Sequence, residues 1–502
     1  MLSPLASVFN RTPLVGHTLA LVSGALMPLS FAPFDLWPIG ILSLVIFLLC
    51  IHGERRAHIV IRFYLYYLGM FALGVNWIFV SINVYGGAST EFAVFLVSLI
   101  VIAWSATGLV HGYLYSRFVA QLPLGLLLGF PILWMLSELF RTWFMTGFPW
   151  LLLGYGHLAS PLAGYAPLLG VYGLSLAVAL TAVLLFLLVT TRKPILIALI
   201  FTLWGSGYLL QQVTFVTEQR QISVVAVQGN IDQHTKWRRE MVVPIFNKYL
   251  SLTENEWGAD LIVWPEASVT LLREHADNML QELDATGEKF GSTLVLGIPD
   301  RDQSGNMYNT AIAIGQGEGI YRKRHLVPFG EYVPFENWLR GVIAFFDLPM
   351  SHNHSGSPEQ KPLQAGALTL SLSICYEVVF QELVRTTASS PDLLVTISND
   401  TWFGTSIGPN QHLQIAQMRA LENGRYLLRT TNNGITALVN HKGEIVESLP
   451  QFQAGVLKGT AGIMSGNTPF HRFGQLPLLI VSLLVLFGQS CWQAIFTPKE
   501  ST

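Results

Sequence analysis

The stretch LSLSICYEVVF, residues 370–380, alternates aliphatic and small polar residues and then breaks that pattern at Cys375. An alternation with a period of two is typical of a β-strand that buries one face. Tyr376 and Glu377 follow the cysteine directly, at the point where the strand pattern stops. The chain has only 3 cysteines, so a thiol at the end of a strand, beside two polar residues, is a candidate functional group.

The same strand pattern recurs on both sides of this stretch and alternates with helix-like segments. The strand-like segments are 222–229, 260–266, 292–300, 309–315, 368–377, 392–400 and 435–448. The helix-like segments are 238–256, 275–290, 378–387 and 410–426. Strands that alternate with helices predict a layered α/β domain, in which sites form beyond the carboxyl ends of strands. Glu266, Cys375 and Asn399 all stand at predicted strand ends.

The rest of the chain has the composition of a membrane protein. Of its 502 residues, 51% are hydrophobic and 12% are charged, whereas soluble proteins carry roughly 25% charged residues. A helix that crosses a bilayer needs about 20 mostly apolar residues. We predict eight such spans: 14–31, 36–51, 60–80, 92–114, 122–140, 166–190, 194–212 and 474–496.

These spans predict three parts and a sidedness. The parts are a membrane domain of seven helices (1–212), an α/β domain (213–473) and an eighth helix with a short tail (474–502). Lys and Arg in short loops are retained on the cytoplasmic side. With the N-terminus inside, the inside positions hold Arg11, Arg55, Arg56, Arg117, Arg192, Lys193 and Lys499. The short outside segments hold only Arg141, so we predict cytoplasmic termini and a periplasmic α/β domain on a bacterial inner membrane.

This sidedness makes Cys375 unusual. Cys50 and Cys491 lie in predicted spans, where small buried thiols are common. Cys375 is therefore alone in a domain that is exported to an oxidising compartment, where an unpaired thiol needs an explanation. No basic run in the sequence points to nucleic acid as a partner.

Two further segments supply groups that could activate this thiol. The segment VWPEAS (263–268) places Glu266 just after a strand and a proline, and YRKRHLVPFGEYVP (321–334) supplies Lys323 and Glu331. A thiol with a pKa of about 8.5 is mostly protonated at pH 7, so it needs a base or a positive field to act as a nucleophile. A carboxylate can accept the proton, and a lysine can stabilise both the thiolate and a developing oxyanion.

Together these residues resemble the nitrilase superfamily, whose Glu–Lys–Cys triad occurs in this chain order within an αββα sandwich. Glu266, Lys323 and Cys375 fill the three places. With the spans added, the chain is similar over essentially its whole length to the bacterial apolipoprotein N-acyltransferase family. The motifs that carry this similarity are GFPWL (147–151), VQGNI (227–231), KW (236–237), HLVPFGEYVP (325–334), ICYE (374–377), ISNDTWFG (397–404) and TTNNGIT (430–436).

The resemblance implies a two-step acyl transfer. Cys375 would take an acyl chain from the sn-1 ester of a phospholipid, with phosphatidylethanolamine as the expected donor, and hold it as a thioester. The α-amine of the S-diacylglyceryl cysteine at the N-terminus of a lipoprotein would then accept the chain as an amide. Glu266 would exchange protons in both steps, and Lys323 and the N–H of Tyr376 would stabilise the oxyanion. No metal or cofactor is expected.

Four other residues are expected to support this site. We expect Glu331 to hold Lys323 in position and keep it protonated, with an ordinary loop carboxylate as the alternative. Tyr376 and Glu377 are expected to shape the turn of the nucleophile. Asn399 is expected to hydrogen-bond near the site or, alternatively, to cap a helix.

Aromatic and charged residues in and near the spans suggest further roles. Trp237, Phe148 and Trp150 are predicted to bind the lipid substrate, with interfacial aromatic residues as the alternative. Glu138 and Arg141 stand three residues apart in the fifth predicted span, and we expect them to pair on one helix face.

Three other functions remain open from the residues alone. His325 and His412 allow a protease-like Cys–His site. The triad with water as the acceptor would give a membrane-tethered amidase or nitrilase for small carbon–nitrogen substrates, but the eight spans would then be unexplained. A transporter or receptor would use the exported domain only for binding, and its function would survive the substitution Cys375→Ala.

Overall fold

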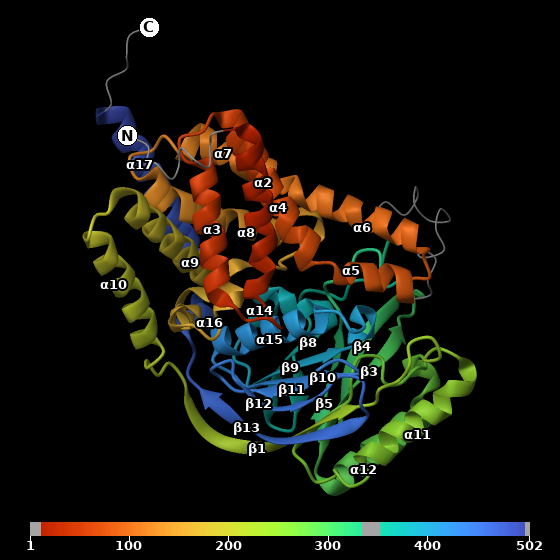
Figure 1. Ribbon diagram of the computed structural model, residues 1–502. Helices are drawn as coiled ribbons and strands as arrows, with labels where there is room; N and C mark the ends of the chain where they lie inside the picture. Colours follow the sequence, from red (N-terminus) through yellow and green to blue (C-terminus); the bar gives the residue numbers. More distant parts are fainter. Residues whose placement is uncertain (1–11, 334–351, 497–502) are drawn as a thin grey trace. The chain divides into compact units, whose positions relative to one another are not determined.

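The computed structural model describes residues 12–333 and 352–496, which form two compact units (Figure 1). Unit 1 comprises Met1–Phe79, Thr90–Thr214 and Arg472–Thr502, and unit 2 comprises Val80–Ser89 and Phe215–His471. Arg11 and Lys499, which entered the prediction of sidedness, lie outside the described residues.

Unit 1 is helical. Its main helices are α2 (Pro13–Leu26), α3 (Trp37–Ile51), α4 (Arg56–Gly74), α6 (Thr90–Ser105), α7 (Thr107–Leu114), α8 (Phe130–Arg141), α9 (Ala166–Thr191), α10 (Ile195–Leu210) and α17 (Leu476–Phe496), and α5 (Trp77–Val80) leads out of it. Within the described residues, 5 helical stretches are long and apolar enough to cross a bilayer: Pro13–Ser30, Arg56–Gly74, Thr90–Val119, Pro161–Thr191 and Leu476–Ile495. Two shorter apolar helices, α3 and α10, coincide with two further predicted spans.

The predicted span 122–140 has a different structure. A π-helical turn, η4 (Gly125–Gly129), leads into α8, which has 12 residues. The helical stretch runs without a break from Gly125 to Arg141, but it is not among the 5 stretches that are long and apolar enough to cross a bilayer. The total of eight spans is therefore not confirmed.

Helix α8 carries two ionisable residues, Glu138 and Arg141. Glu138 and Arg141 are both buried, with Nη2 of Arg141 4.0 Å from Oε1 of Glu138, which confirms the predicted pairing. The same carboxylate oxygen accepts hydrogen bonds from Nε1 of Trp134 at 3.0 Å and from the N–H of Leu153 at 2.8 Å. Buried ionisable groups need such protein partners, so α8 is bound to its neighbours by polar contacts as well as by packing.

Unit 2 contains two β-sheets. The first has the strand order β13-β1-β2-β3-β4-β6 and the second β12-β11-β10-β9-β8-β7-β5. The strands of the first sheet are β1 (Thr217–Gln228), β2 (Leu261–Val263), β3 (Thr293–Arg301), β4 (Met307–Gly315), β6 (Ile320–Arg322) and β13 (Gly455–Ser465). Those of the second are β5 (Gly317–Glu318), β7 (Leu363–Ala365), β8 (Leu368–Ile374), β9 (Leu393–Ser398), β10 (Leu427–Thr431), β11 (Thr436–Val439) and β12 (Ile445–Leu449).

The two sheets pack face to face and helices cover their outer faces (Figure 1). Val263 of the first sheet and Leu372 of the second lie in the aliphatic core between them. On the outer side of the first sheet, α11 (Val242–Thr253) and α12 (Asp277–Phe290) pack on a second core that includes Trp264. On the second sheet, Oγ of Ser371 donates to the carbonyl of Val384 in α14 (Gln381–Thr387), and α15 (Gly408–Asn423) lies beside it. This arrangement confirms the predicted α/β domain.

Parallel pairing brings several strand ends to one edge. β1, β2 and β3 are parallel in the first sheet, and β8, β9 and β10 are parallel in the second. Their carboxyl ends lead into the residues that the sequence singled out. One strand prediction was wrong: 435–448 is not a single strand but the hairpin β11–β12, because the N–H of Asn440 and the carbonyl of Glu444 bond across a turn that contains Gly443 at a φ of 79°.

A short arm from the membrane-helix half of the sequence belongs to unit 2. The arm, Val80–Ser89, contains the π-helical turn η2 (Ser81–Tyr85). Oγ of Ser81 donates to the carbonyl of Trp402 at 2.8 Å. The ring of Tyr85 stacks on His234, with centroids 5.5 Å apart, and meets the ring of Trp402 edge-on at 5.9 Å. The arm therefore bridges the loop after β1 and the loop after β9.

The arm should depend on the ring of Tyr85. An aromatic pair contributes roughly 0.5–1.5 kcal/mol beyond its buried area. Tyr85 makes two such pairs, so Tyr85→Ala should make local opening of residues 80–89 at least about fivefold more frequent. Tyr85→Phe keeps the ring and should behave like the unmodified protein. Hydrogen exchange of the peptide that contains 80–89 measures this opening. Equal protection in Tyr85→Ala and Tyr85→Phe would show that the ring does not hold the arm.

Candidate active site

Cys375 stands where β8 ends and the 3-10 turn η11 (Cys375–Val379) begins. Its φ is 54°, in the left-handed region that costs a residue other than glycine roughly 1–2 kcal/mol. The chain therefore turns sharply at the cysteine instead of continuing the strand. The side chain is partly exposed and packs at the border of the core between the sheets.

The carboxylate of Glu377 fixes this turn from inside. Its Oε2 accepts a hydrogen bond from the N–H of Ile374 at 2.8 Å, and its Oε1 accepts from the N–H groups of Arg324 and His325 at 2.7 and 3.1 Å. The hydroxyl of Tyr321 donates to the same carboxylate. Burial raises the pKa of Glu377, and the bound N–H groups oppose that rise. Glu377 thus ties the turn of the nucleophile to the segment that follows β6.

Glu266 lies just past the end of β2 and is buried. Nδ2 of Asn309 donates to its Oε1 at 2.6 Å, and the N–H of Asn399 donates to its Oε2 at 2.8 Å. The next residue, Ala267, has a φ of 48°, and a Cβ on Gly297 of β3 would lie 2.5 Å from its nitrogen. Glycine is therefore required for β3 to approach this turn. Both carboxylate oxygens of Glu266 are held from neighbouring strands and loops.

Lys323 follows β6 and is 1% exposed. Its Nζ lies 2.8 Å from Oε2 of Glu331 and 3.7 Å from Oε1 of Glu266. Asn309 connects all three, since its Nδ2 also donates to Oε1 of Glu331 at 2.9 Å and its carbonyl accepts the N–H of Lys323 at 2.8 Å. Burial disfavours the ammonium, but the charges of Glu331 and Glu266 outweigh it and hold the pKa of Lys323 above its ordinary value. Lys323 is thus a fixed cation.

The Cys375 thiol is protonated in the resting site. Burial raises its pKa to about 12, the charge of Glu266 adds to the rise, and Lys323 opposes it. These mutual effects place Glu266, Lys323 and Cys375 in one electrostatic environment. The arrangement favours transfer of the thiol proton to a base during attack rather than a thiolate formed in advance.

The histidines on which a Cys–His site would depend have other contacts. The ring of His325 packs on aromatic neighbours. Nε2 of His412 lies 3.3 Å from the carbonyl oxygen of Cys375, and its Nδ1 lies 3.1 Å from Oδ1 of Asp400, which also pairs with Arg429. Burial lowers the pKa of His412, and the charge of Arg429 lowers it further. His412 is therefore placed to support the main chain of the turn.

The predicted aromatic residues lie in different surroundings. Tyr376 is buried beside the nucleophile, with its ring 5.2 Å from that of Phe380. Trp237 is 41% exposed. Phe148 and Trp150 belong to unit 1, where both are buried and stack on each other at 6.1 Å. Contact of Trp237, Phe148 and Trp150 with a lipid chain stays a prediction.

Two residues that hold Glu266 were overlooked in the sequence. Asn309 begins the predicted strand NTAIAIG. An asparagine on the buried side of a strand needs hydrogen-bond partners, and this could have marked it as a site residue. Lys236 precedes Trp237 in the motif KW, and a role was predicted only for Trp237. Lys236 is fully buried, and its Nζ donates to the main-chain oxygen of Glu266 at 3.1 Å.

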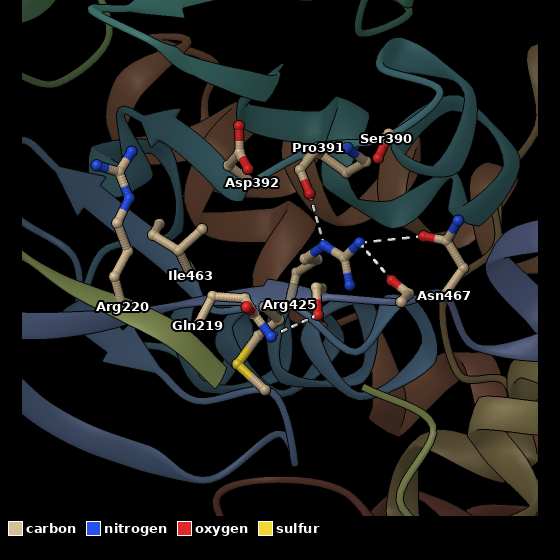
Figure 2. A pocket seen from close by; sticks show the side chains of 11 residues that line it. Gln219, Arg220, Ser390, Pro391, Asp392, Arg425, Ile463 and Asn467 are labelled. Carbon is tan, nitrogen blue, oxygen red and sulfur yellow. Dashed lines mark hydrogen bonds between the residues drawn. The ribbon is translucent and has the colours of Figure 1, made fainter. Parts of the chain in front are cut away.

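A hollow of about 410 Å³ lies at the opposite ends of the strands (Figure 2). Its lining comes from the beginning of β1, the segments that precede β9 and β10, and the end of β13. Figure 2 shows Arg425 bound there to the carbonyls of Pro391 and Gly466 and to the side chain of Asn467. These bonds give Arg425 a structural role, and the hollow is separate from the site around Cys375.

Loss of the Glu377 carboxylate should destabilise unit 2. Glu377→Ala leaves the N–H groups of Ile374, Arg324 and His325 without this acceptor, and each unsatisfied buried group costs about 1–3 kcal/mol. We expect a loss of about 3 kcal/mol or more in the free energy of unfolding, measured by denaturant titration in detergent. Glu447→Ala, at an exposed carboxylate, is the control. Equal midpoints for the two variants would contradict the proposed role of Glu377.

The raised pKa of Cys375 predicts slow alkylation at neutral pH. Because the thiolate is the reactive form, the rate with iodoacetamide should rise about tenfold per pH unit from pH 7 to 10. Mass spectrometry of the peptide that contains Cys375 gives the rate. A rate that levels off above about pH 9 would mean an ordinary thiol pKa of about 8.5 and would contradict the burial argument.

Two family models match the chain. The model described as carbon-nitrogen hydrolase matches residues 223–461, and the model of the apolipoprotein N-acyltransferase N-terminal domain matches residues 23–184. Among solved structures, Saccharomyces cerevisiae Nit3, a member of branch 10 of the nitrilase superfamily, is similar at 18% identity and a TM-score of 0.38, over 57% of this chain and 98% of that one.

Curated relatives named apolipoprotein N-acyltransferase match nearly the full length. The protein of Azotobacter vinelandii is 44% identical over 484 residues, which is 94% of each chain. The protein of Pseudomonas syringae pv. tomato is 42% identical over 94% of this chain and 96% of its own. The protein of Photobacterium profundum is 39% identical over 93% and 92%. With this identity over both the helical unit and the α/β unit, the chain belongs to the apolipoprotein N-acyltransferase family.

Proposed function

We propose that this enzyme transfers an acyl chain from the sn-1 position of a phospholipid to the α-amine of the N-terminal S-diacylglyceryl cysteine of lipoproteins. The relatives support lipoprotein N-acylation in general terms. The observation that carries the chemistry is the buried ammonium of Lys323 between two carboxylates, in the site where β8 ends at Cys375. The donor, the thioester and the residue roles are part of the proposal.

In the first step, Sγ of Cys375 attacks the ester carbonyl while its proton passes to Glu266. The tetrahedral intermediate then collapses, the bond from the carbonyl carbon to the glycerol oxygen breaks, and Glu266 returns the proton to the departing alkoxide. The products are an acyl-thioester and a lysophospholipid. A protonated resting thiol fits this sequence, because one carboxylate then serves first as base and then as acid.

Lys323 and the N–H of Tyr376 stabilise the oxyanion of this intermediate. The two neighbouring carboxylates hold the pKa of Lys323 above its ordinary value, so Lys323 keeps its charge while Glu266 gains and loses a proton. Glu331 keeps the ammonium in place at 2.8 Å. The division of roles is therefore a fixed cation, a mobile proton at Glu266 and a nucleophile at Cys375.

In the second step, the lipoprotein amine attacks the thioester and gives a proton to Glu266. The carbon–sulfur bond breaks, the amide is released, and the proton returns to the sulfur. Both substrates are lipids, so a site at a membrane surface meets them by lateral diffusion. We place the enzyme in the bacterial inner membrane with unit 2 in the periplasm and with phosphatidylethanolamine as the donor, as the charge asymmetry of the loops and the family resemblance suggest.

The thioester can be trapped. Incubation with phosphatidylethanolamine that carries a labelled sn-1 chain, without acceptor, should label Cys375 in a form that hydroxylamine removes. Glu266→Gln and Lys323→Met should each lower the rate of labelling by at least about 100-fold, because they remove the base or the oxyanion contact. Cys375→Ala should give no label, whereas Cys491→Ser should label normally.

Addition of a diacylglyceryl-modified lipopeptide should then move the label into an amide. Labelling of Cys375→Ala, or labelling that requires His412 or His325 but not Glu266, would refute the mechanism. Release of the label as free fatty acid, with no transfer to the lipopeptide, would instead make water the acceptor and the protein a hydrolase.

A further inference from the structure

Lys236 is a buried charge that the mechanism above does not use. Its relative exposure is 0%, and its Nζ donates to the main-chain oxygen of Glu266 at 3.1 Å. An isolated buried ammonium is costly, so its position needs a compensating partner or a function. Lys236 lies on the loop after β1, 30 residues before Glu266 in the chain.

The loop that carries Lys236 is fixed to the same edge of the sandwich as the nucleophile. The side chain of Asn432 bonds to both the N–H and the carbonyl of Ile231, at 2.9 and 2.8 Å. Oε1 of Gln233 accepts from Nδ2 of Asn399 at 2.8 Å, and the N–H of Asn399 is the group that binds Glu266. The N–H of Lys236 itself donates to the carbonyl of Asp232 at 2.9 Å. The hydrogen bonds of this loop therefore fix the main chain of Lys236, so the position of the lysine does not depend on its charge alone.

The charges around Glu266 leave a place for a second cation. Glu266 and Glu331 face one ammonium, Lys323, and the thiol of Cys375 is neutral at rest. Burial lowers the pKa of Lys236 to about 8, against the opposing effect of Glu266, so this lysine is still mostly protonated at pH 7. Lys236 thus adds a second buried ammonium beside Glu266.

We propose that Lys236 is a positioning residue that fixes the turn of Glu266 through its main-chain oxygen and keeps the Glu266 carboxylate ionised for its role as base. This inference rests on the proposed function, because it needs Glu266 as the group that accepts the thiol proton. The charge of Glu266 favours the ammonium of Lys236 against burial, and the same attraction favours the ionised carboxylate. Removal of Lys236 should therefore raise the pH at which Glu266 becomes a competent base.

The other charged groups near this pair come from several elements. Lys323 after β6, Glu331 beyond it and Cys375 after β8 face Glu266. Asp232 lies on the loop of Lys236 itself, where Oδ1 accepts from the N–H groups of the next residues. Substitution of Lys236 leaves these groups in place, so a shift in the pH profile reports on the lysine.

The test is the rate of acyl-thioester formation on Cys375 from pH 4.5 to 9, with phosphatidylethanolamine and the full-length protein in detergent. In Lys236→Met, which keeps most of the side-chain volume, the acid limb should move up by about one pH unit. Lys236→Gln should shift it in the same direction, and Lys236→Arg should restore it. Lys289→Met, at an exposed lysine of α12, should leave the limb unchanged.

A lysine that served only for packing would lower the rate equally at every pH and would not be rescued by arginine. An unshifted acid limb in both Lys236→Met and Lys236→Gln therefore overturns the inference. If one neutral variant does not fold, the other decides. The proposed function fails separately: it fails if Glu266→Gln forms the thioester at the normal rate, whatever the Lys236 variants do.

Discussion

The site is organised around one interaction, the ion pair of the buried Lys323 with Glu331 and Glu266. A buried ammonium is tolerated when opposite charges and hydrogen bonds surround it. Here Glu266 follows β2, Lys323 follows β6 and Glu331 lies on the loop beyond, and Asn309 of β4 bridges the two carboxylates. The loss of one partner would leave an uncompensated buried charge, so the positions of these elements are coupled. The same coupling fixes the distance between Glu266 and Lys323, which the proposed mechanism uses as base and cation.

The nucleophile is held by a different principle. Cys375 occupies a left-handed backbone conformation, and the turn persists because Glu377 binds N–H groups on both sides of the site. His412 contacts the carbonyl of the same cysteine. The hydrogen bonds from main-chain N–H groups to Glu377 thus offset the cost of the left-handed conformation at Cys375. Such contacts are invisible in a sequence, because a glutamate two residues after a cysteine does not reveal which N–H groups it will accept.

Much of the fold followed from periodicity, and the failures have physical causes. Period-two patterns predicted the strands on both sides of Cys375, since those strands bury one or both faces. The hairpin at 436–449 was missed although its turn, residues 440–444, holds only polar residues and Gly443 and so interrupts the alternation of its strands. The span 122–140 stays unconfirmed, because it is a shorter helical stretch in which Glu138 and Arg141 bind protein partners. The triad Glu266, Lys323 and Cys375 stays a prediction that rests on motifs and family resemblance, whereas Asn309 and Lys236 act through contacts across the sheet and through a main-chain oxygen.

The burial of the site supports the proposed transfer of a proton from the thiol of Cys375 to Glu266. Low polarity disfavours a free thiolate and raises the pKa of Cys375 to about 12, so attack and proton transfer have to be coupled. Lys323 is unsuited to release a proton, since two carboxylates hold its charge. A carboxylate that changes its protonation state beside a cation that does not is the combination that lets one residue act as base and then as acid. In the proposed mechanism, the thioester would lie in the same surroundings of low polarity that raise the pKa of the thiol, which would slow its hydrolysis until an amine arrives.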